Sequence, residues 1–189
     1  NGGDDTRRMG PPFIETESAA FLAMNRNKRS MVLNFKEPAG VEAMKKLVKD
    51  ADIVIENYRT GVMERLGLGY EDLKAINPGI IYCSVSGFGR TGPYAKRGGY
   101  DLIAQGMSGI MSFTGVPGTP PVKAGVPIAD MNAGMFSVYG ILTAYINKLK
   151  TGNGQYLEIS LLEAALAYTV WESAGYFATG EVAGPLGSS

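Results

Sequence analysis

The chain has 189 residues, 45% of them hydrophobic and 19% charged, which is typical of a globular protein with a substantial core. Its 18 lysine and arginine residues balance 18 aspartate and glutamate residues, and this zero net charge argues against a general nucleic-acid binder. The sequence contains no histidine, which excludes Ser-His and Cys-His nucleophile systems and removes the commonest metal ligand.

The first third of the chain changes from irregular to regular at about residue 30. Residues 1–29 are polar, rich in glycine and proline, and do not begin with methionine, so we expect no capped element there and a chain cut from a longer protein. The pattern then predicts a strand at 31–35 and a helix from Pro38 to Val48. A second strand at 52–58 is apolar enough to be buried on both faces.

The middle of the chain continues this alternation of strands and helices. We expect short helices at 60–68 and 70–76, followed by a third buried strand at 80–86. This order indicates βαβ units, a parallel sheet and the α/β class. Ligands of such sheets bind beyond the carboxyl ends of the strands, which directs attention to residues 56–58 and 86–89.

The loop at 90–100 carries three basic and two aromatic side chains. It is interpreted equally well as a solvated surface loop or as a clamp for a phosphorylated, nucleotide-bearing ligand. A helix at 101–111 and a long Pro/Gly loop at 114–125 follow it.

The last third is expected to be mainly helical. Residues 131–149 are apolar almost all round and predict a buried helix. A turn at 150–155 precedes a strand at 156–160 and a helix at 161–178, and residues 180–189 read as the start of a linker.

Asp130 stands immediately before the predicted buried helix, and two interpretations of it are open. The simpler one is an N-cap, whose carboxylate accepts the N–H groups of the first turn. A carboxylate held ionised at a helix N-terminus also suits a covalent nucleophile.

The cellular setting is indicated by one cysteine and by the hydropathy pattern. Cys83 excludes an internal disulfide, fits a reducing compartment and lies in an apolar run typical of a buried strand. No signal peptide opens the chain, and its longest uncharged stretch, 102–122, is broken by glycines and prolines. We therefore expect no membrane span and a cytoplasmic or organelle-matrix location.

With these segments in place, the chain resembles the class III CoA-transferase family of formyl-CoA transferases, carnitine CoA-transferases and α-methylacyl-CoA racemases. The resemblance is carried in order by Asn27-Lys-Arg-Ser30, Leu33-Asn-Phe-Lys36, 52–58, Glu64-Arg-Leu-Gly67, Asn77-Pro78, 84–89, Thr91-Gly-Pro93, Gly99-Tyr-Asp101, Ala129-Asp130 and 151–155. It implies a Rossmann-like parallel sheet with flanking helices, forming part of the CoA-binding large domain. It further implies that the first strands and a smaller domain lie outside the chain, and that the whole protein is an interlocked homodimer.

The resemblance also implies a chemistry. Asp130 corresponds to the nucleophile, which attacks the donor acyl-CoA to form a mixed anhydride and then an aspartyl-CoA thioester. CoA is finally passed to a small carboxylic acid, so acyl-CoA is a substrate and no cofactor is permanently bound. Neither a metal nor a nucleic acid is expected.

The family positions around CoA carry over to the following residues: Leu33, Asn34, Phe35, Lys36, Asn57, Tyr58, Arg65, Gly98, Gly99, Tyr100 and Asp101. Some formyl-CoA transferases carry a lysine at the position of Gly98, and Lys96 or Arg97 is a candidate to replace that charge.

Three alternatives remain. An acyl-CoA racemase exchanges an α-proton, but Tyr100 stands where the family's racemases carry a histidine, and an unperturbed tyrosine titrates near pH 10. A dinucleotide-binding Rossmann domain is disfavoured because no G-x-G-x-x-G opens a helix after a strand. A non-catalytic scaffold would leave Asp130 as a cap only.

Overall fold

The structure is a computed structural model in which residues 3–187 are described. The chain divides into two compact units, Asn1–Leu33 and Asn34–Ser189, and each is considered by itself.

The first unit is small and consists of short helices and strands. Its elements are the 3-10 helix η1 (Asp5–Arg8), the antiparallel strands β1 (Phe13–Ile14) and β2 (Glu17–Ser18), and helix α1 (Ala19–Met24). Buried Ser18 accepts the N–H of Phe21 as the N-cap of α1 and donates its hydroxyl to the carbonyl of Thr6. The expectation of no capped element in residues 1–29 is therefore wrong for the described part, and residues 1–2 lie outside it.

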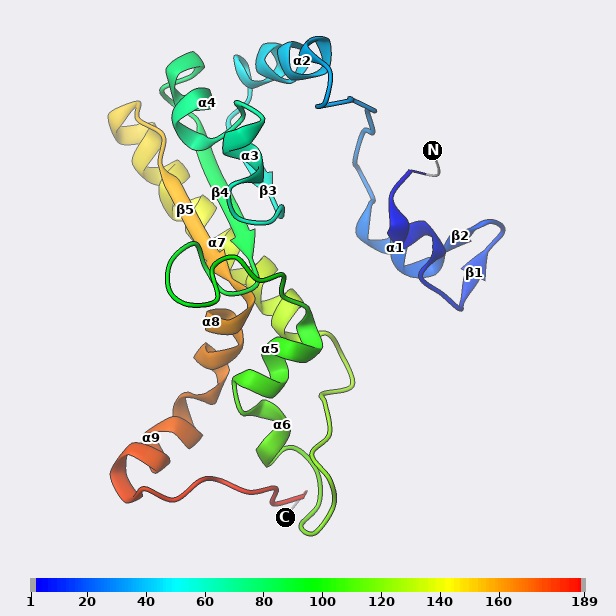
Figure 1. Ribbon diagram of the computed structural model, residues 1–189, viewed down its shortest axis with the longest axis vertical. Helices are drawn as coiled ribbons and strands as arrows, with labels where there is room; N and C mark the ends of the chain where they lie inside the picture. The colour runs from blue at the N-terminus through cyan, green and yellow to red at the C-terminus, as the bar shows by residue number, and fades with distance from the viewer. Residues whose placement is uncertain (1–2, 188–189) are drawn as a thin grey trace. The chain divides into compact units, whose positions relative to one another are not determined.

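The second unit is built on a parallel sheet, as predicted (Figure 1). Strands β3 (Ile53–Glu56), β4 (Ile81–Ser86) and β5 (Tyr156–Ser160) pair in the order β3-β4-β5. Cys83 lies at the centre, opposite Ile55 on one side and Leu157 on the other, and is fully buried as expected.

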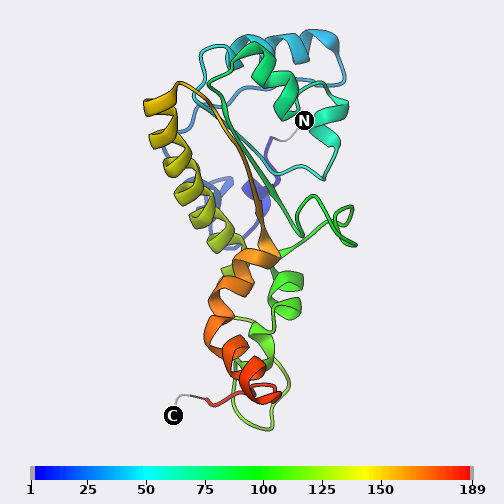
Figure 2. The ribbon, with the colours of Figure 1, turned by 90° about the vertical axis from the view of Figure 1, so that its left-hand side faces the viewer.

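Helices cover both faces of this sheet, so the α/β class is confirmed. Helices α2 (Pro38–Val48), α3 (Val62–Arg65) and α4 (Tyr70–Ile76) pack on one face, and α7 (Ile128–Thr151) packs on the other (Figure 2). The alternation of strand side chains sends Ile80 and Tyr82 toward the first group and Ile81 and Cys83 toward α7.

A second helical layer lies beyond the carboxyl ends of the strands. It consists of α5 (Asp101–Met107), α6 (Ile110–Phe113), α8 (Leu161–Leu166), the 3-10 helix η2 (Ala167–Thr169) and α9 (Val170–Thr179). The single helix expected at 101–111 is interrupted by Gly109, whose φ of 87° is left-handed. The helix expected at 161–178 is interrupted by η2, where the Thr169 hydroxyl donates to the carbonyl of Leu166.

Two expected elements are shorter or absent. The strand at 31–35 does not form: Val32 is 89% exposed, and no other strand of the described residues pairs with this segment. A strand is stable only when its backbone groups find a partner, which local β-propensity cannot supply. The helix expected at 60–68 is limited to α3 because Gly61 and Gly67 both adopt positive φ.

Two elements expected to be buried all round have one exposed face. In β3 the side chains of Val54 and Glu56 are buried, whereas those of Ile53 and Ile55 are exposed. Helix α7 buries a stripe of small residues, and its opposite face exposes Met131, Met135, Val138, Tyr139, Leu142, Ile146 and Leu149. The reason is topological: β3 is an edge strand, and the core under α7 draws on β4 and β5.

The remaining segments agree with the sequence. Helices α2 and α4 and strand β5 occupy their predicted positions. Residues 181–187 form no helix or strand, and residues 188–189 of the expected linker lie outside the described part. Among residues 3–187, no helix combines the length and hydropathy needed to cross a bilayer.

Candidate active site

Two neighbouring cavities open beyond the carboxyl ends of β3 and β4, where the sheet topology predicts a ligand site. The smaller, of 200 Å³, is lined by Asn57, Tyr58, Arg59, Thr60, Ser86, Gly87, Arg97, Gly98, Gly99 and Tyr100. The larger, of 450 Å³, is lined by Ile55, Asn57, Val85, Gly99, Tyr100, Asp130, Ala133, Gly134, Ser137, Val138, Ile141 and Leu161. Because they share Asn57, Gly99 and Tyr100, an extended ligand placed in one reaches the other.

A close contact between two glycines lies beside these cavities, since Gly87 lines the smaller one and Gly99 lines both. A Cβ added at Gly99 would lie 2.3 Å from the Cα of Gly87, and a Cβ added at Gly87 would lie 2.4 Å from the Cα of Gly99. The loop before α5 therefore packs directly on the end of β4, which only a pair of glycines permits.

The ends of β3 and β4 are joined by polar side chains. The amide of Asn57 donates to the carbonyl of Val85 at 2.7 Å. The buried carboxylate of Glu56 accepts the hydroxyl of Ser84 and, at 2.7 Å, the N–H of Tyr58. These bonds hold Asn57 and Tyr58 at the rim of the smaller cavity.

Asp130 lies in the first turn of α7 and faces the larger cavity. The N-cap interpretation is wrong, because α7 begins at Ile128 and Pro127 precedes it. The capping role falls to Asp101, whose Oδ1 accepts the N–H of Ala129 at 2.8 Å and the N–H of Asp130 at 3.3 Å. The predicted residues Asp101 and Asp130 are thus brought together by hydrogen bonds from α7 to the start of α5.

The carboxylate of Asp130 is left available for chemistry. Its residue is exposed, and among residues 3–187 no hydrogen bond to its side-chain oxygens is found. Partial desolvation, with a smaller contribution from the nearby charge of Asp101, raises the pKa of Asp130 above its ordinary value. This direction is opposite to the one expected for a carboxylate at a helix N-terminus.

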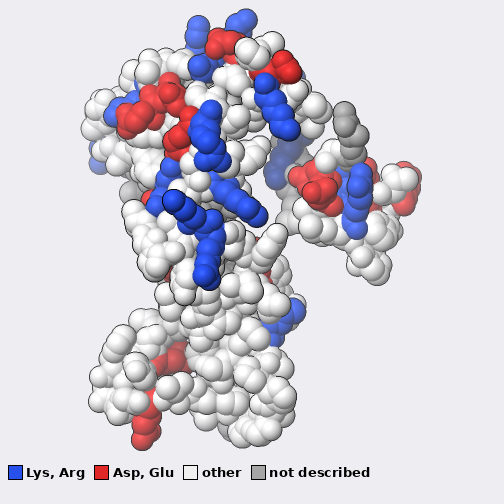
Figure 3. Space-filling view, in the orientation of Figure 1, with Lys and Arg blue, Asp and Glu red and all other residues white. Residues whose placement is uncertain are grey.

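Basic side chains gather on the loops beside the smaller cavity (Figure 3). Arg59 and Arg97 both line it, and the Arg59 Nε would lie 3.6 Å from a Cβ at Gly98. The guanidinium of Arg97 also lies 4.4 Å from the ring centroid of Tyr94. Of the charges considered as replacements for a lysine at Gly98, Arg97 lines the cavity and Lys96 does not.

Six predicted CoA-contacting residues line neither cavity, and one of them is Asp101, which caps α7. Leu33 belongs to the first unit. Residues 34–36 form a turn before α2, in which the Asn34 side chain accepts the N–H of Lys36 at 3.1 Å and Phe35 packs on the core. Arg65 is exposed on α3. The contacts of these residues with CoA remain predictions.

Sequence reasoning missed three residues near the site. Arg59 could have been found, because it directly follows the strand-end residues Asn57 and Tyr58. Gly134, one turn beyond Asp130, leaves open space on the cavity side, since a Cβ there would meet nothing within 4 Å. Gln105, which bonds to Asp101, gave no local signal because its partners lie far along the chain.

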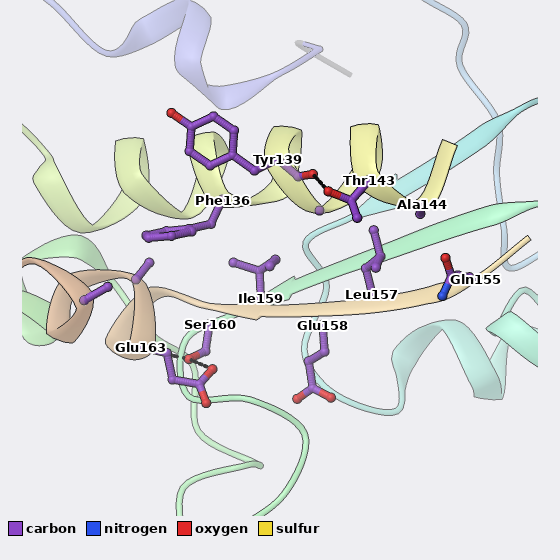
Figure 4. A pocket seen from close by; sticks show the side chains of 13 residues that line it. Phe136, Tyr139, Thr143, Ala144, Gln155, Leu157, Glu158, Ile159, Ser160 and Glu163 are labelled. Atoms are coloured by element: carbon purple, nitrogen blue, oxygen red, sulfur yellow. Dashed lines mark hydrogen bonds between the residues drawn. The ribbon is translucent and has the colours of Figure 1, made fainter. Parts of the chain in front are cut away.

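A third cavity, of 520 Å³, is larger but lies elsewhere, between α7, the free edge of β5 and α8 (Figure 4). Figure 4 shows Phe136 of α7 on the side that faces Leu157 and Ile159 of β5, whereas the ring of Tyr139 points away from the strand. None of the predicted site residues lines it. The chemistry-bearing side chains therefore converge on the two smaller cavities.

The chain matches a family model and is similar in sequence to curated proteins. The model of "CoA-transferase family III" matches residues 1–189. A succinate–glutarate CoA-transferase of Agrobacterium fabrum is 44% identical over 100% of this chain and 48% of its own length. An acetyl-CoA:oxalate CoA-transferase of Acetobacter aceti is 41% identical over 98% of this chain and 48% of its own.

A solved structure agrees at the level of the fold. A CaiB/BaiF family protein from Brucella suis superimposes with a TM-score of 0.94 at 46% identity, covering 98% of this chain and 50% of that one. The chain thus spans about half the length of the relatives it matches.

Proposed function

The chain belongs to CoA-transferase family III, and we propose that the protein it forms part of moves CoA from an acyl-CoA donor to a carboxylic acid through covalent intermediates on Asp130. The observation that supports this most is the placement of Asp130. Its carboxylate faces a 450 Å³ cavity while its own N–H is held by Asp101.

The chemistry proposed for Asp130 needs no proton transfer. A carboxylate oxygen attacks the thioester carbonyl, the C–S bond breaks, and an anhydride and the CoA thiolate result. The thiolate attacks the aspartyl carbonyl of the anhydride, forms an aspartyl-CoA thioester and releases the donor acid. The acceptor carboxylate then displaces the thiolate to form a second anhydride, and the thiolate attacks its acceptor carbonyl, which regenerates Asp130. A site without histidine suits this series of steps, because every nucleophile and every leaving group is an anion.

The two cavities divide the binding of acyl-CoA between them. Arg59 and Arg97 offer charge-assisted bonds to phosphates at the smaller cavity, where Tyr58 offers a ring for stacking. The chain of the ligand passes Asn57, Gly99 and Tyr100 and brings the thioester to Asp130. CoA contacts of Leu33, Asn34, Phe35, Lys36 and Arg65 are proposed on the family resemblance alone.

Tyr100 supports transfer over racemisation. It lines both cavities, at the position where the family's racemases carry a histidine as the acid–base group. We assign it a packing or hydrogen-bonding role beside the thioester.

The domain organisation, oligomeric state and compartment of the whole protein are also proposed, from the family resemblance and from its cysteine content. The chain forms part of a large CoA-binding domain, with residues from about 180 leading toward a smaller one, in an interlocked homodimer. The buried, lone Cys83 suits a reducing cytoplasm or organelle matrix.

The test is an acceptor screen with the intact protein. Succinyl-CoA and acetyl-CoA would each be incubated in deuterated water with glutarate, oxalate, formate and longer carboxylic acids, and the CoA esters separated by chromatography. We expect at least one acceptor to gain CoA without deuterium at the donor's α-carbon. Deuterium uptake by a 2-methylacyl-CoA without any acceptor would instead favour racemisation.

A further inference from the structure

Gln105 places a fully buried amide between Asp101 and the loop that leads into α7. Buried polar groups require hydrogen-bond partners, and this amide uses both of its ends. Its Nε2 donates to Asp101 Oδ2 at 2.6 Å and to the carbonyl of Val126 at 3.4 Å. Its Oε1 accepts the N–H of Ala124 at 2.8 Å.

These bonds continue to the nucleophile through Asp101. The second oxygen of Asp101 accepts the N–H groups of Ala129 and Asp130, so both carboxylate oxygens are engaged by N–H donors. One amide therefore connects three segments: α5, the loop at 124–126, and the first turn of α7. Gln105 lines neither cavity, so any effect on the reaction must pass through these contacts.

We propose that Gln105 is a positioning residue for Asp130, fixing Asp101 and the preceding loop so that the Asp130 carboxylate is aimed into the larger cavity. This inference rests on the proposed function, because orientation matters only if Asp130 reacts. The physical basis is that covalent attack needs the reacting atoms held in a narrow range of distance and angle, and a displacement of about 1 Å costs about 100-fold.

Asn77 supplies a matched control, because it makes the same kind of clamp away from the site. Its Nδ2 donates to the carbonyls of Val48 and Ala51 at 3.0 and 2.9 Å, and its Oδ1 accepts the N–H of Gly79 at 3.1 Å. Like Gln105 it ties a loop to a helix end, but no part of this clamp touches either cavity.

The experiment compares Gln105→Met with Asn77→Leu in the intact protein, since each change exchanges an amide for an apolar side chain of similar shape. With rates corrected for folded fraction, we expect Gln105→Met to lower kcat by about 10- to 100-fold and to leave the acyl-CoA KM within about twofold. Asn77→Leu should keep a wild-type kcat. Equal kcat values for the two variants would overturn the proposal.

A second variant and a second readout guard against simple misfolding. Gln105→Glu keeps an acceptor for Ala124 but places a carboxylate against Asp101, so its kcat should fall further than that of Gln105→Met. A wild-type kcat for it would contradict the clamp. Hydrogen exchange should accelerate at residues 124–133 in both Gln105 variants and stay unchanged there in Asn77→Leu, and unchanged exchange in Gln105→Met would also overturn the proposal.

The failures of the two proposals are distinguishable. A wild-type protein that transfers CoA, together with an unimpaired Gln105→Met, removes only the positioning role. A wild-type protein that transfers no CoA removes the proposed function and the positioning role with it.

Discussion

The core under α2 and α4 and the cavities at the carboxyl ends of the strands use the same sheet in opposite ways. In the core, Leu68, Leu73 and Ile80 are fully buried, and three tyrosine rings pack with centroids 5.4 to 6.1 Å apart. At the cavities, Tyr100 is 76% exposed and Asp130 is also an exposed residue. Packing is therefore concentrated where no chemistry is proposed, and the rim beyond the strands is left open for a ligand.

Truncating the core should separate stability from activity most clearly. Leu73→Ala removes a fully buried side chain and should lower the free energy of unfolding by about 2–5 kcal/mol. Chemical denaturation would measure the loss, and kcat per folded molecule should be unchanged because Leu73 lines neither cavity. Equal losses of kcat and stability would show that the two regions are coupled.

Adding a side chain at the contact between Gly87 and Gly99 should affect the cavities and leave the core unchanged. Gly99→Ala places a Cβ 2.3 Å from the Cα of Gly87 and must displace the loop, so we expect the acyl-CoA KM to rise about tenfold. Gly140→Ala is the control, because its Cβ would lie 3.6 Å from the Leu157 side chain, an ordinary contact, and Gly140 lines neither cavity. Similar KM values for the two variants would argue against a tight contact between Gly87 and Gly99.

The two carboxylates should produce a smaller, pH-dependent effect. Asp130 must be ionised to attack the thioester. Because its pKa is raised, kcat/KM should begin to fall at a higher pH than it would for an ordinary aspartate. Asp101→Asn removes the neighbouring charge and should shift this acid limb to lower pH. An unshifted or upward-shifted limb in the pH profile would contradict the assignment of that limb to Asp130.

The same pKa direction has a consequence for stability. A carboxyl group whose pKa is raised on folding stabilises the folded state below its unfolded pKa, and this contribution is lost as pH rises through the folded pKa. Asp130 thus favours folding least at the pH where it is reactive, in contrast to the uncharged side chains of the core.

The parts of the fold predicted from sequence are those with local signals. The apolar run at 80–86 and the alternation of strands and helices around it predicted a buried parallel strand, and β4 confirms it. The segment at 31–35 has the same local signal, but no strand among residues 3–187 pairs with it, and the pattern could not reveal this. Local propensity gives an element only when tertiary pairing supports it.

The candidate site shows the same limit: residues with a local signal were predicted, and residues placed by contacts between distant segments were not. The resemblance pointed to Asp130, and topology pointed to the strand ends at Asn57. The capping of α7 by Asp101, across 28 residues, and the amide of Gln105 depend on contacts between distant segments. No spacing rule in the sequence predicts such contacts, so the N-cap interpretation considered Asp130 and not Asp101.

The central claim is that Asp130 becomes acylated, and mass spectrometry of the intact protein tests it directly. After incubation with an acyl-CoA and trapping with hydroxylamine or borohydride, the modification should map to the peptide containing Asp130 and be absent from Asp130→Asn. That variant should lose at least about 1,000-fold in kcat, as expected when a covalent nucleophile is removed. Full CoA transfer by Asp130→Asn, or an adduct on a different residue, would contradict the account.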